Sequence, residues 1–264
     1  MPQLFPRTNP TDEEILELLK RAFQKRIPSG RDIATRAVSA GLADHATDVE
    51  WIKANFSNLV ELVQIDAYEE YLKAERVAGR ETLEEVFLPL LHANTSAEDA
   101  VRVVSERFFS LDRFYLALTQ GRRPRAGKAF ELVIRELFIR LGYPFTPQAV
   151  INGQPDFVLP SIEHFRVNAP DCIIFTVKRT LRERWRQIVT EGTRGLGFFL
   201  ATIDEKVGGR DLGEMLNSRI NLVVPDRIKQ QCYSTIPNVV SFEYFFRFHL
   251  DPAMERWRDA GLLA

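Results

Sequence analysis

The sequence predicts an α/β fold, with helices flanking a mixed central sheet and a helical region before it. Three apolar runs, at residues 172–177, 197–202 and 221–225, are nearly continuous, which is typical of strands buried on both faces of a sheet. Segments with helical spacing of apolar residues separate these runs. Strands that alternate with helices along the chain favour an α/β core.

Residues 1–118 are expected to form the helical N-terminal region. Thr11 can cap the first helix, because Glu14 stands three residues later in a capping-box pattern. Further helices are expected at residues 31–40, 47–63, 67–78, 81–91 and 97–118. The character of the sequence changes near Gly121, so we predict that the core domain spans residues 119–264.

The predicted core begins with a helix at residues 125–141, which Gly142 and Pro144 end. Short strands are expected at residues 157–159 and 239–241, in addition to the three buried runs. Further helices are expected at residues 181–191, 212–217 and 242–248. Strands and helices therefore share the second half of the chain.

The composition is that of an ordinary globular protein and excludes several classes. Of 264 residues, 45% are hydrophobic and 27% are charged, with a net charge of −1. No run of apolar residues is long enough to cross a membrane, and the first ten residues lack a signal peptide's apolar core. Two cysteines, Cys172 and Cys232, make neither a disulfide framework nor a four-ligand zinc site. We therefore expect a cytoplasmic protein with no membrane contact.

Three residues stand where a hydrolytic metal site could form. Lys178 ends a buried strand, and an ammonium group there costs several kcal/mol unless an acid pairs with it. Asp156 precedes it by 22 residues and Glu191 follows it by 13. Two carboxylates suit Mg²⁺, which activates a bound water, and the lysine can orient that water or stabilise developing charge. By spacing alone, a structural ion pair between Asp156 and Lys178 remains an open alternative.

Three segments, at residues 122–131, 155–161 and 177–188, carry a resemblance to a known family. In these segments the chain resembles the PD-(D/E)xK nuclease superfamily, and within it the EcoRII, SsoII and PspGI branch of type II restriction enzymes. Weaker similarity continues through residues 222–225, so the resemblance covers roughly residues 118–250. It implies a PD-(D/E)xK restriction-endonuclease-like core and a Mg²⁺-dependent type II site-specific deoxyribonuclease that cuts double-stranded DNA.

The resemblance also implies roles for the site residues. Thr176 stands where the general motif has an acid, and this branch carries that carboxylate on the following helix, at Glu191. Asp156 and Glu191 are then the metal ligands, and Lys178 is the water-orienting or charge-stabilising residue. Glu131 matches an auxiliary acid of the family, with an ordinary exposed helix carboxylate as the alternative.

DNA recognition is implied for a further set of residues. Side chains at the start of a helix can contact base edges. Arginine pairs with guanine and glutamate accepts from cytosine, so alternating Arg and Glu suits adjacent G·C pairs. The readers implied by the resemblance are Arg182, Glu183, Arg184 and Gln120. The resemblance also implies that the central base or bases flip out of the duplex and stack on an aromatic side chain. The candidates are Trp51 and Phe56, and a position in the protein core is the alternative for each. The candidate phosphate contacts are Arg122, Arg123, Arg125 and Lys128, whose alternative is a solvated basic face.

The resemblance implies a palindromic site containing CC(N or W)GG, cut before the first C to leave 5′ overhangs. A symmetric site implies a homodimer, whose surface we expect in the N-terminal helices. A cognate DNA methyltransferase would act on the same site without needing to bind this protein. The rival interpretations are a same-fold nuclease of DNA repair or transposition, an inactive DNA-binding module and a purely structural helical protein.

Overall fold

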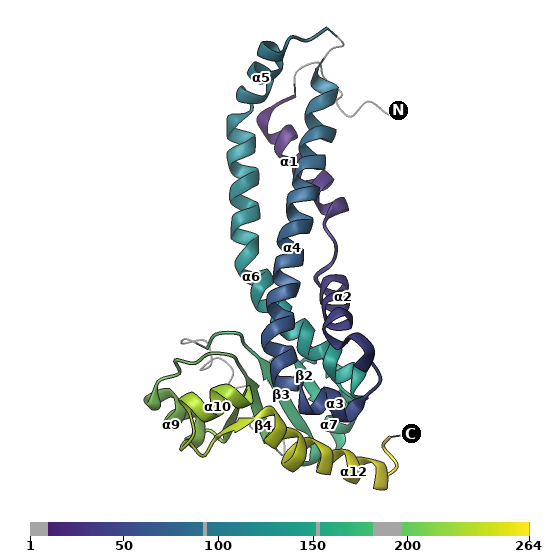
Figure 1. The fold of residues 1–264 in the computed structure, drawn as a ribbon, viewed down its shortest axis with the longest axis vertical. Helices are drawn as coiled ribbons and strands as arrows, with labels where there is room; N and C mark the ends of the chain where they lie inside the picture. The colour runs from purple at the N-terminus through teal and green to yellow at the C-terminus, as the bar shows by residue number, and fades with distance from the viewer. Residues whose placement is uncertain (1–9, 92–93, 152–153, 182–196, 264) are drawn as a thin grey trace. The chain divides into compact units, whose positions relative to one another are not determined.

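The computed structural model describes residues 10–91, 94–151, 154–181 and 197–263. These residues divide into two compact units (Figure 1). The first unit takes its residues from 1–33 and 68–126, and the second takes its residues from 34–67 and 127–264. The predicted boundary at residue 118 separates a helical region from a nuclease core, so it is a statement about function as well as packing. It stays a prediction.

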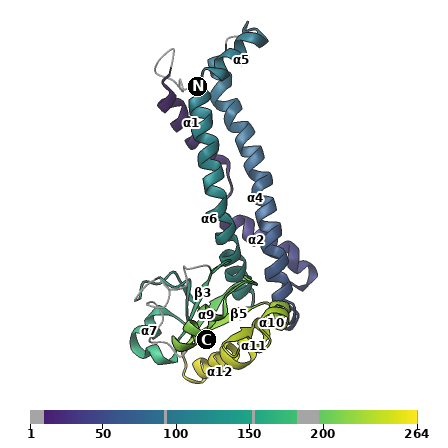
Figure 2. The same cartoon turned by 90° about the vertical axis from the view of Figure 1, so that its left-hand side faces the viewer.

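The first unit is helical. It contains α1 (Asp12–Arg26), the start of α2 (Gly30–Leu42), most of α4 (Phe56–Phe87), η2 (Leu88–Leu90), α5 (Ala97–Ser105) and the first part of α6 (Phe108–Arg140). The predicted capping box is confirmed, because Thr11 and Glu14 each bond to the other's backbone. Figures 1 and 2 show the second half of α4 beside the first half of α6. One apolar cluster joins α1, α4 and α6: Ile15, Leu19, Ala22, Phe23, Ala78, Val86, Phe87 and Phe114.

Several predicted helix ends in this part of the chain are wrong. α4 continues without interruption where the sequence predicted three helices. α6 continues through Gly121 and Pro124, where the sequence predicted a boundary between two helices. In a helix interior a glycine costs about 1 kcal/mol and a proline about 3 kcal/mol, and the burial of several large side chains along the helix can offset both. In α6, Phe114 before these residues and Phe130 after them are both buried.

The second unit is built on a mixed sheet, as predicted. In the described residues the sheet has six strands in sequence order: β1 (Thr146–Pro147), β2 (Phe157–Leu159), β3 (Ile173–Val177), β4 (Gly197–Ala201), β5 (Ile220–Val224) and β6 (Val239–Ser241). β1, β2 and β3 pair antiparallel, and β3 to β6 pair parallel. The three buried runs of the sequence are β3, β4 and β5, so these strand predictions are confirmed.

Helices cover both faces of the sheet. The described helical elements of this unit, besides parts of α2, α4 and α6, are η1 (Ala43–His45), α3 (Val49–Ala54), α7 (Ile162–Asn168), η3 (Ala169–Asp171), α9 (Gly209–Asn217), α10 (Asp226–Cys232), α11 (Phe242–Phe245), a π-helical turn η5 (Phe246–Leu250) and α12 (Asp251–Asp259). On one face, Phe175 contacts Phe138 of α6 and Phe245 of α11. On the other face, Leu200 and Leu222 cluster with residues of α9 and α10.

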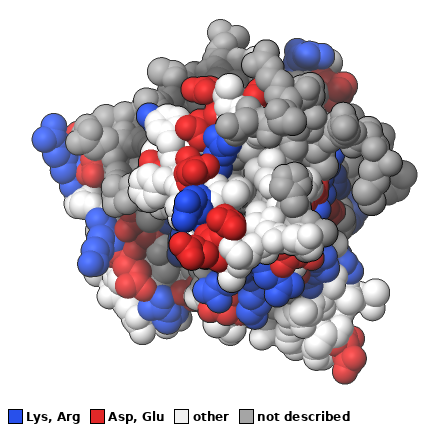
Figure 3. All heavy atoms as spheres, turned by 90° about the horizontal axis from the view of Figure 1, so that it is seen from above, with Lys and Arg blue, Asp and Glu red and all other residues white. Residues whose placement is uncertain are grey.

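The distribution of charge and hydropathy agrees with the composition. Basic and acidic side chains are interspersed on the face that Figure 3 shows, and the net charge of the chain is −1. None of the described helices is both long and apolar enough to cross a membrane.

Candidate active site

Asp156 lies at the entry of β2, where the antiparallel pairing brings it beside the end of β3. The register pairs Phe157 with Phe175, so the next residue outward on each strand, Asp156 and Thr176, come together. Asp156 is 7% exposed. Its Oδ2 accepts hydrogen bonds from the Thr176 hydroxyl at 2.8 Å, the Val177 N–H at 2.7 Å and the Lys178 ammonium at 3.2 Å. These hydrogen bonds all end on Oδ2, so the described residues leave Oδ1 available to another ligand.

Lys178 lies at the carboxyl end of β3 and has the acidic partner that its position requires. Its ammonium group pairs with Asp156, and its side chain is 36% exposed. Its backbone N–H donates to the carbonyl of Ala201 at 2.9 Å, which fixes the end of β3 to β4. The amine is therefore held at the sheet edge and still reaches solvent.

Glu131 is the second acid of this site and lies on α6. Its side chain is only 13% exposed, which excludes the alternative of an ordinary exposed helix carboxylate. Burial raises the pKa of Glu131, and the negative charge of Asp156 raises it further. The nearby ammonium groups of Lys128 and Lys178 lower it by less. The electrostatic influence of Asp156 and Lys178 shows that Glu131 shares their surroundings.

Thr176 is a site residue that the sequence did not reveal. In the sequence, Thr176 stands out only as the residue at the position where the general motif has an acid. In the structure it is 1% exposed and its hydroxyl holds one oxygen of Asp156. The antiparallel register of β2 on β3 is the signal that could have found it, because the register sets Thr176 opposite Asp156.

Several predicted residues lie outside the described part of the chain. These are the second metal ligand Glu191 and the readers Arg182, Glu183 and Arg184. The same holds for the side chain of Arg123 and for most of the helix predicted at residues 181–191. Their predicted roles stay predictions.

The described acids suit a hard divalent cation. Mg²⁺ binds oxygen ligands and is held by one or two carboxylates with several waters. Asp156 supplies the available Oδ1, and Glu131 supplies a carboxylate whose one described partner is Lys128. The described residues contain no group of three side chains that could hold a metal by themselves. Asp156 and Glu131 are the described carboxylates that could hold such a cation, and Glu191 is the predicted further ligand.

The described phosphate-contact candidates already have partners. Arg122 donates to the buried Glu75 carboxylate at 2.8 and 2.6 Å. The Arg125 guanidinium bonds the Tyr71 hydroxyl and lies 4.7 Å from the centre of that ring. Arg122 and Arg125 are 42% and 37% exposed at their side chains, so each still offers part of its charge to solvent.

Lys128 and Gln120 are the remaining polar candidates on α6. The Lys128 ammonium pairs with Glu131 Oε1, and its side chain is 43% exposed. Gln120 is exposed. The structure therefore places Lys128 in the same cluster as Glu131, Asp156 and Lys178.

The two aromatic candidates have different surroundings. Trp51 is half-buried, and its ring is parallel to the His45 ring, with centroids 4.1 Å apart and planes at 5°. Phe56 is 1% exposed and packs against Phe138, Phe242 and Phe246. A base has no open face of Phe56 on which to stack, so its prediction as a stacking residue is corrected to the core alternative.

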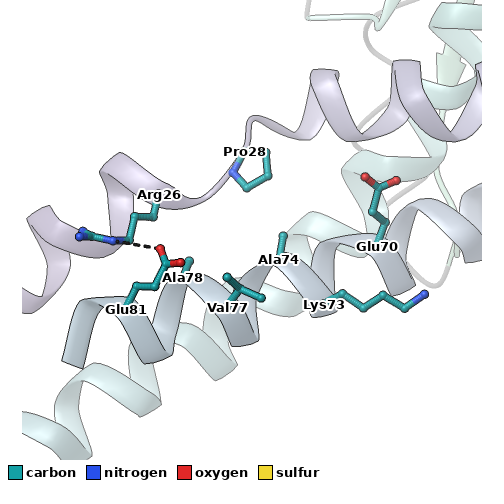
Figure 4. A pocket seen from close by; sticks show the side chains of 8 residues that line it. All are labelled: Arg26, Pro28, Glu70, Lys73, Ala74, Val77, Ala78 and Glu81. Atoms are coloured by element: carbon teal, nitrogen blue, oxygen red, sulfur yellow. Dashed lines mark ion pairs between the residues drawn. The ribbon is translucent and has the colours of Figure 1, made fainter. Parts of the chain in front are cut away.

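A pocket of about 350 Å³ in the first unit is separate from these residues (Figure 4). It lies between α1 and α4, and its lining residues are Arg26, Pro28, Glu70, Lys73, Ala74, Val77, Ala78 and Glu81. Arg26 pairs with Glu81 at 3.4 Å on one side of it. The pocket contains none of the predicted catalytic side chains.

Comparison with known proteins identifies two relatives that are both type II restriction enzymes. The chain is 32% identical to the type II restriction enzyme EcoRII of Escherichia coli over 138 residues, which is 49% of this chain and 34% of that protein. It is 29% identical to the type II restriction enzyme SsoII of Shigella sonnei over 161 residues, which is 55% of this chain and 52% of that protein. The chain therefore spans about a third and about half of these two relatives.

Two solved structures share the fold. Metal-depleted Ecl18kI in complex with uncleaved DNA matches with a TM-score of 0.73 and 22% identity, over 97% of this chain and 88% of that one. PspGI in complex with substrate DNA matches with a TM-score of 0.58 and 21% identity, over 90% of this chain and 96% of that one. A family model described as EcoRII C terminal matches residues 91–246, more than half of the chain. The chain therefore belongs to the EcoRII C-terminal family.

Proposed function

We propose that this protein is a Mg²⁺-dependent type II restriction endonuclease that cuts double-stranded DNA. The observation that carries the proposal is the carboxylate of Asp156, whose Oδ2 is fixed by three donors, one of them Lys178, and whose charge acts on the nearby Glu131. Its relatives EcoRII and SsoII are type II restriction enzymes, and Ecl18kI and PspGI bind DNA.

The proposed mechanism gives each residue one task. Asp156 and Glu191 would hold the metal, which would supply a more acidic bound water and neutralise charge on the phosphate. The Lys178 amine, held by Asp156 Oδ2, orients the attacking water or stabilises the charge that develops on the phosphate. Glu131, with its raised pKa, is the auxiliary acid of the site. Thr176 acts as a positioning residue, since its hydroxyl keeps Asp156 from rotating.

The proposed recognition follows the family. Arg182, Glu183 and Arg184 read the G·C pairs of a palindromic site containing CC(N or W)GG, with Gln120 as a further reader, and cutting before the first C leaves 5′ overhangs. Trp51 is the proposed platform for a flipped base. Trp51 is half-buried, so part of it remains accessible, unlike Phe56, and this supports the role.

We further propose that the enzyme is a homodimer in which each subunit cuts one strand. Exposed apolar side chains on the first unit support this. Phe108 is 74% exposed, Val101 66% and Leu88 61%, so each has apolar area that an interface could bury.

Digestion of a sequenced plasmid with Mg²⁺, followed by sequencing of the ends, tests the proposed function. We expect discrete fragments whose 5′ overhangs start before the first C of CC(N or W)GG. Random nicking or ends of unrelated sequence would instead indicate another nuclease of the same fold. Specific binding without any cleavage would indicate an inactive DNA-binding module.

A further inference from the structure

Lys128 and Glu131 form an ion pair on one face of α6, and the two side chains differ in their exposure to solvent. They are three residues apart, so one helical turn brings the ammonium to Glu131 Oε1. The lysine side chain is 43% exposed and the glutamate side chain 13%. A solvent-exposed cation therefore neutralises a buried acid from the outside.

The site as described has two acids and two ammonium groups, in two pairs. Lys178 pairs with Asp156, and that carboxylate is also held by Thr176 and by the Val177 N–H. Glu131 is held by fewer hydrogen bonds than Asp156, because among the described residues only Lys128 donates to it. Lys128 is thus the ammonium group that can leave its carboxylate with the least disturbance of the surrounding backbone.

A divalent cation and Lys128 compete for the negative charge of Glu131. A metal near Glu131 would meet the like charge of the ammonium while that pair is formed. A DNA phosphate offers Lys128 another anion, because lysine binds phosphate as a mobile point charge on a flexible stem. The exposed position of Lys128 permits such an exchange.

We propose that Lys128 is a displaceable counter-ion that couples DNA binding to metal binding. In the DNA-free protein it neutralises Glu131 and weakens the site for divalent cations. When DNA binds, a backbone phosphate draws the ammonium away, and the uncompensated charge of Glu131 then strengthens the neighbouring Asp156 site for the metal. This inference rests on the proposed function, since it takes DNA as the substrate, and it makes Lys128 a positioning residue for Glu131.

The first test measures Mn²⁺ binding to the whole protein without DNA, by electron paramagnetic resonance. We expect Lys128→Met and Lys128→Gln to bind Mn²⁺ about tenfold more tightly than the unmodified protein, within the usual range of such couplings. Lys128→Arg, which keeps the charge, should bind like the unmodified protein. Adding Glu131→Gln to Lys128→Met should remove the gain. Unchanged or weaker Mn²⁺ binding by both uncharged variants would overturn the proposal.

The second test measures the other side of the same coupling, which is reciprocal. The affinity for a duplex that carries the mapped site is measured with and without Ca²⁺ at constant ionic strength. The gain that Ca²⁺ brings should shrink about tenfold in Lys128→Met. Arg210→Met is the matched control, because it removes one charge from an exposed ion pair on α9. An equal gain in Lys128→Met and in the control would contradict the coupling.

The two proposals fail in different ways. A protein that cuts no DNA with Mg²⁺ but shows the tighter Mn²⁺ binding of Lys128→Met would disprove the nuclease and leave the counter-ion role of Lys128 in place. A protein that cuts its site while both Lys128 variants bind Mn²⁺ normally would leave the nuclease in place and reduce Lys128 to a phosphate contact.

Discussion

The two oxygens of Asp156 have different surroundings, and this difference organises the site. Oδ2 accepts three hydrogen bonds from β3 and its end, and none of the described residues donates to Oδ1. A carboxylate fixed in this way needs little rearrangement before it can bind an ion. One of these contacts also holds the Lys178 amine at a defined position beside the Asp156 carboxylate.

We expect Lys178→Ala to lose cleavage and keep specific DNA binding. The proposed role of the amine lies in the chemical step, and removal of one such charge-stabilising group costs about 100- to 1,000-fold in rate. Single-turnover cleavage with Mg²⁺ and anisotropy with Ca²⁺ measure the two properties. Cleavage at the normal rate by this variant would remove Lys178 from the mechanism.

Glu131→Gln should raise the thermal stability of the metal-free protein at neutral pH. The pKa of Glu131 is raised in the folded protein, so the folded state binds this proton more tightly than the unfolded chain. The stability that the residue contributes therefore falls as the pH rises through that raised pKa. The advantage of glutamine should be absent below the ordinary pKa of 4.5, where both states are protonated, and should grow above it.

Thermal unfolding between about pH 4 and pH 8 measures this effect. The exposed Glu163 of α7 provides the control variant Glu163→Gln, for which we expect no such trend. A constant difference between Glu131→Gln and the unmodified protein across this range would contradict the electrostatic cause.

At the scale of single residues, the sequence predicted a contact correctly where a buried charge requires a partner of opposite charge. The buried strand end at Lys178 required an acid, and Asp156 is that acid. Prediction failed for Thr176, because a hydroxyl group leaves no charge pattern in the sequence. It also failed for Phe56, whose burial depends on α6 and α11 residues far away in the chain.

At the scale of elements, the pairing of β2 with β3 builds the site. Antiparallel register sets Asp156 beside Thr176 and Val177, so two short strands bring together residues about twenty positions apart. The strands were predictable, because their apolar runs need no long-range information. The continuity of α4 and α6 was not, because packing along a helix overrides the weak preferences of single glycines.

We expect Thr176→Val to slow cleavage about tenfold with DNA affinity unchanged. The substitution keeps the shape of the side chain and removes its hydrogen bond to the Asp156 carboxylate. A hydrogen bond to a charged group is worth about 1.5 kcal/mol or more, which corresponds to about tenfold in rate. Single-turnover rates and anisotropy measure the two effects. Thr176→Ser, which keeps the hydroxyl, should restore most of the rate. Full activity of Thr176→Val would show that the strand pairing holds Asp156 without this hydroxyl.

At the scale of the whole molecule, the division into two units could not be read from the sequence. Residues 34–67 belong with the sheet although they precede most of the helical unit. Packing of Phe56 on Phe242 and Phe246 ties this stretch to the second unit, and such contacts become visible only in three dimensions.

Phe108→Ser should weaken the proposed dimer. Phe108 is 74% exposed on the first unit, so its removal should cost the monomer little and the dimer a buried aromatic contact. Sedimentation velocity should show more monomer, and supercoiled plasmid should give more nicked product. Val167→Ser is the control, because Val167 is 86% exposed on α7 of the second unit. Identical sedimentation of both variants would place the interface elsewhere.

The continuity of α6 has a rotational consequence for the catalytic cluster. Each residue advances an α-helix by about 100°, and 3.6 residues complete a turn. Glu131 and Phe138 lie in the same uninterrupted helix within the second unit, so the turns between them set the direction in which the two side chains point. Insertion of a single alanine between them would turn either Glu131 away from Asp156 or Phe138 away from its contact with Phe175.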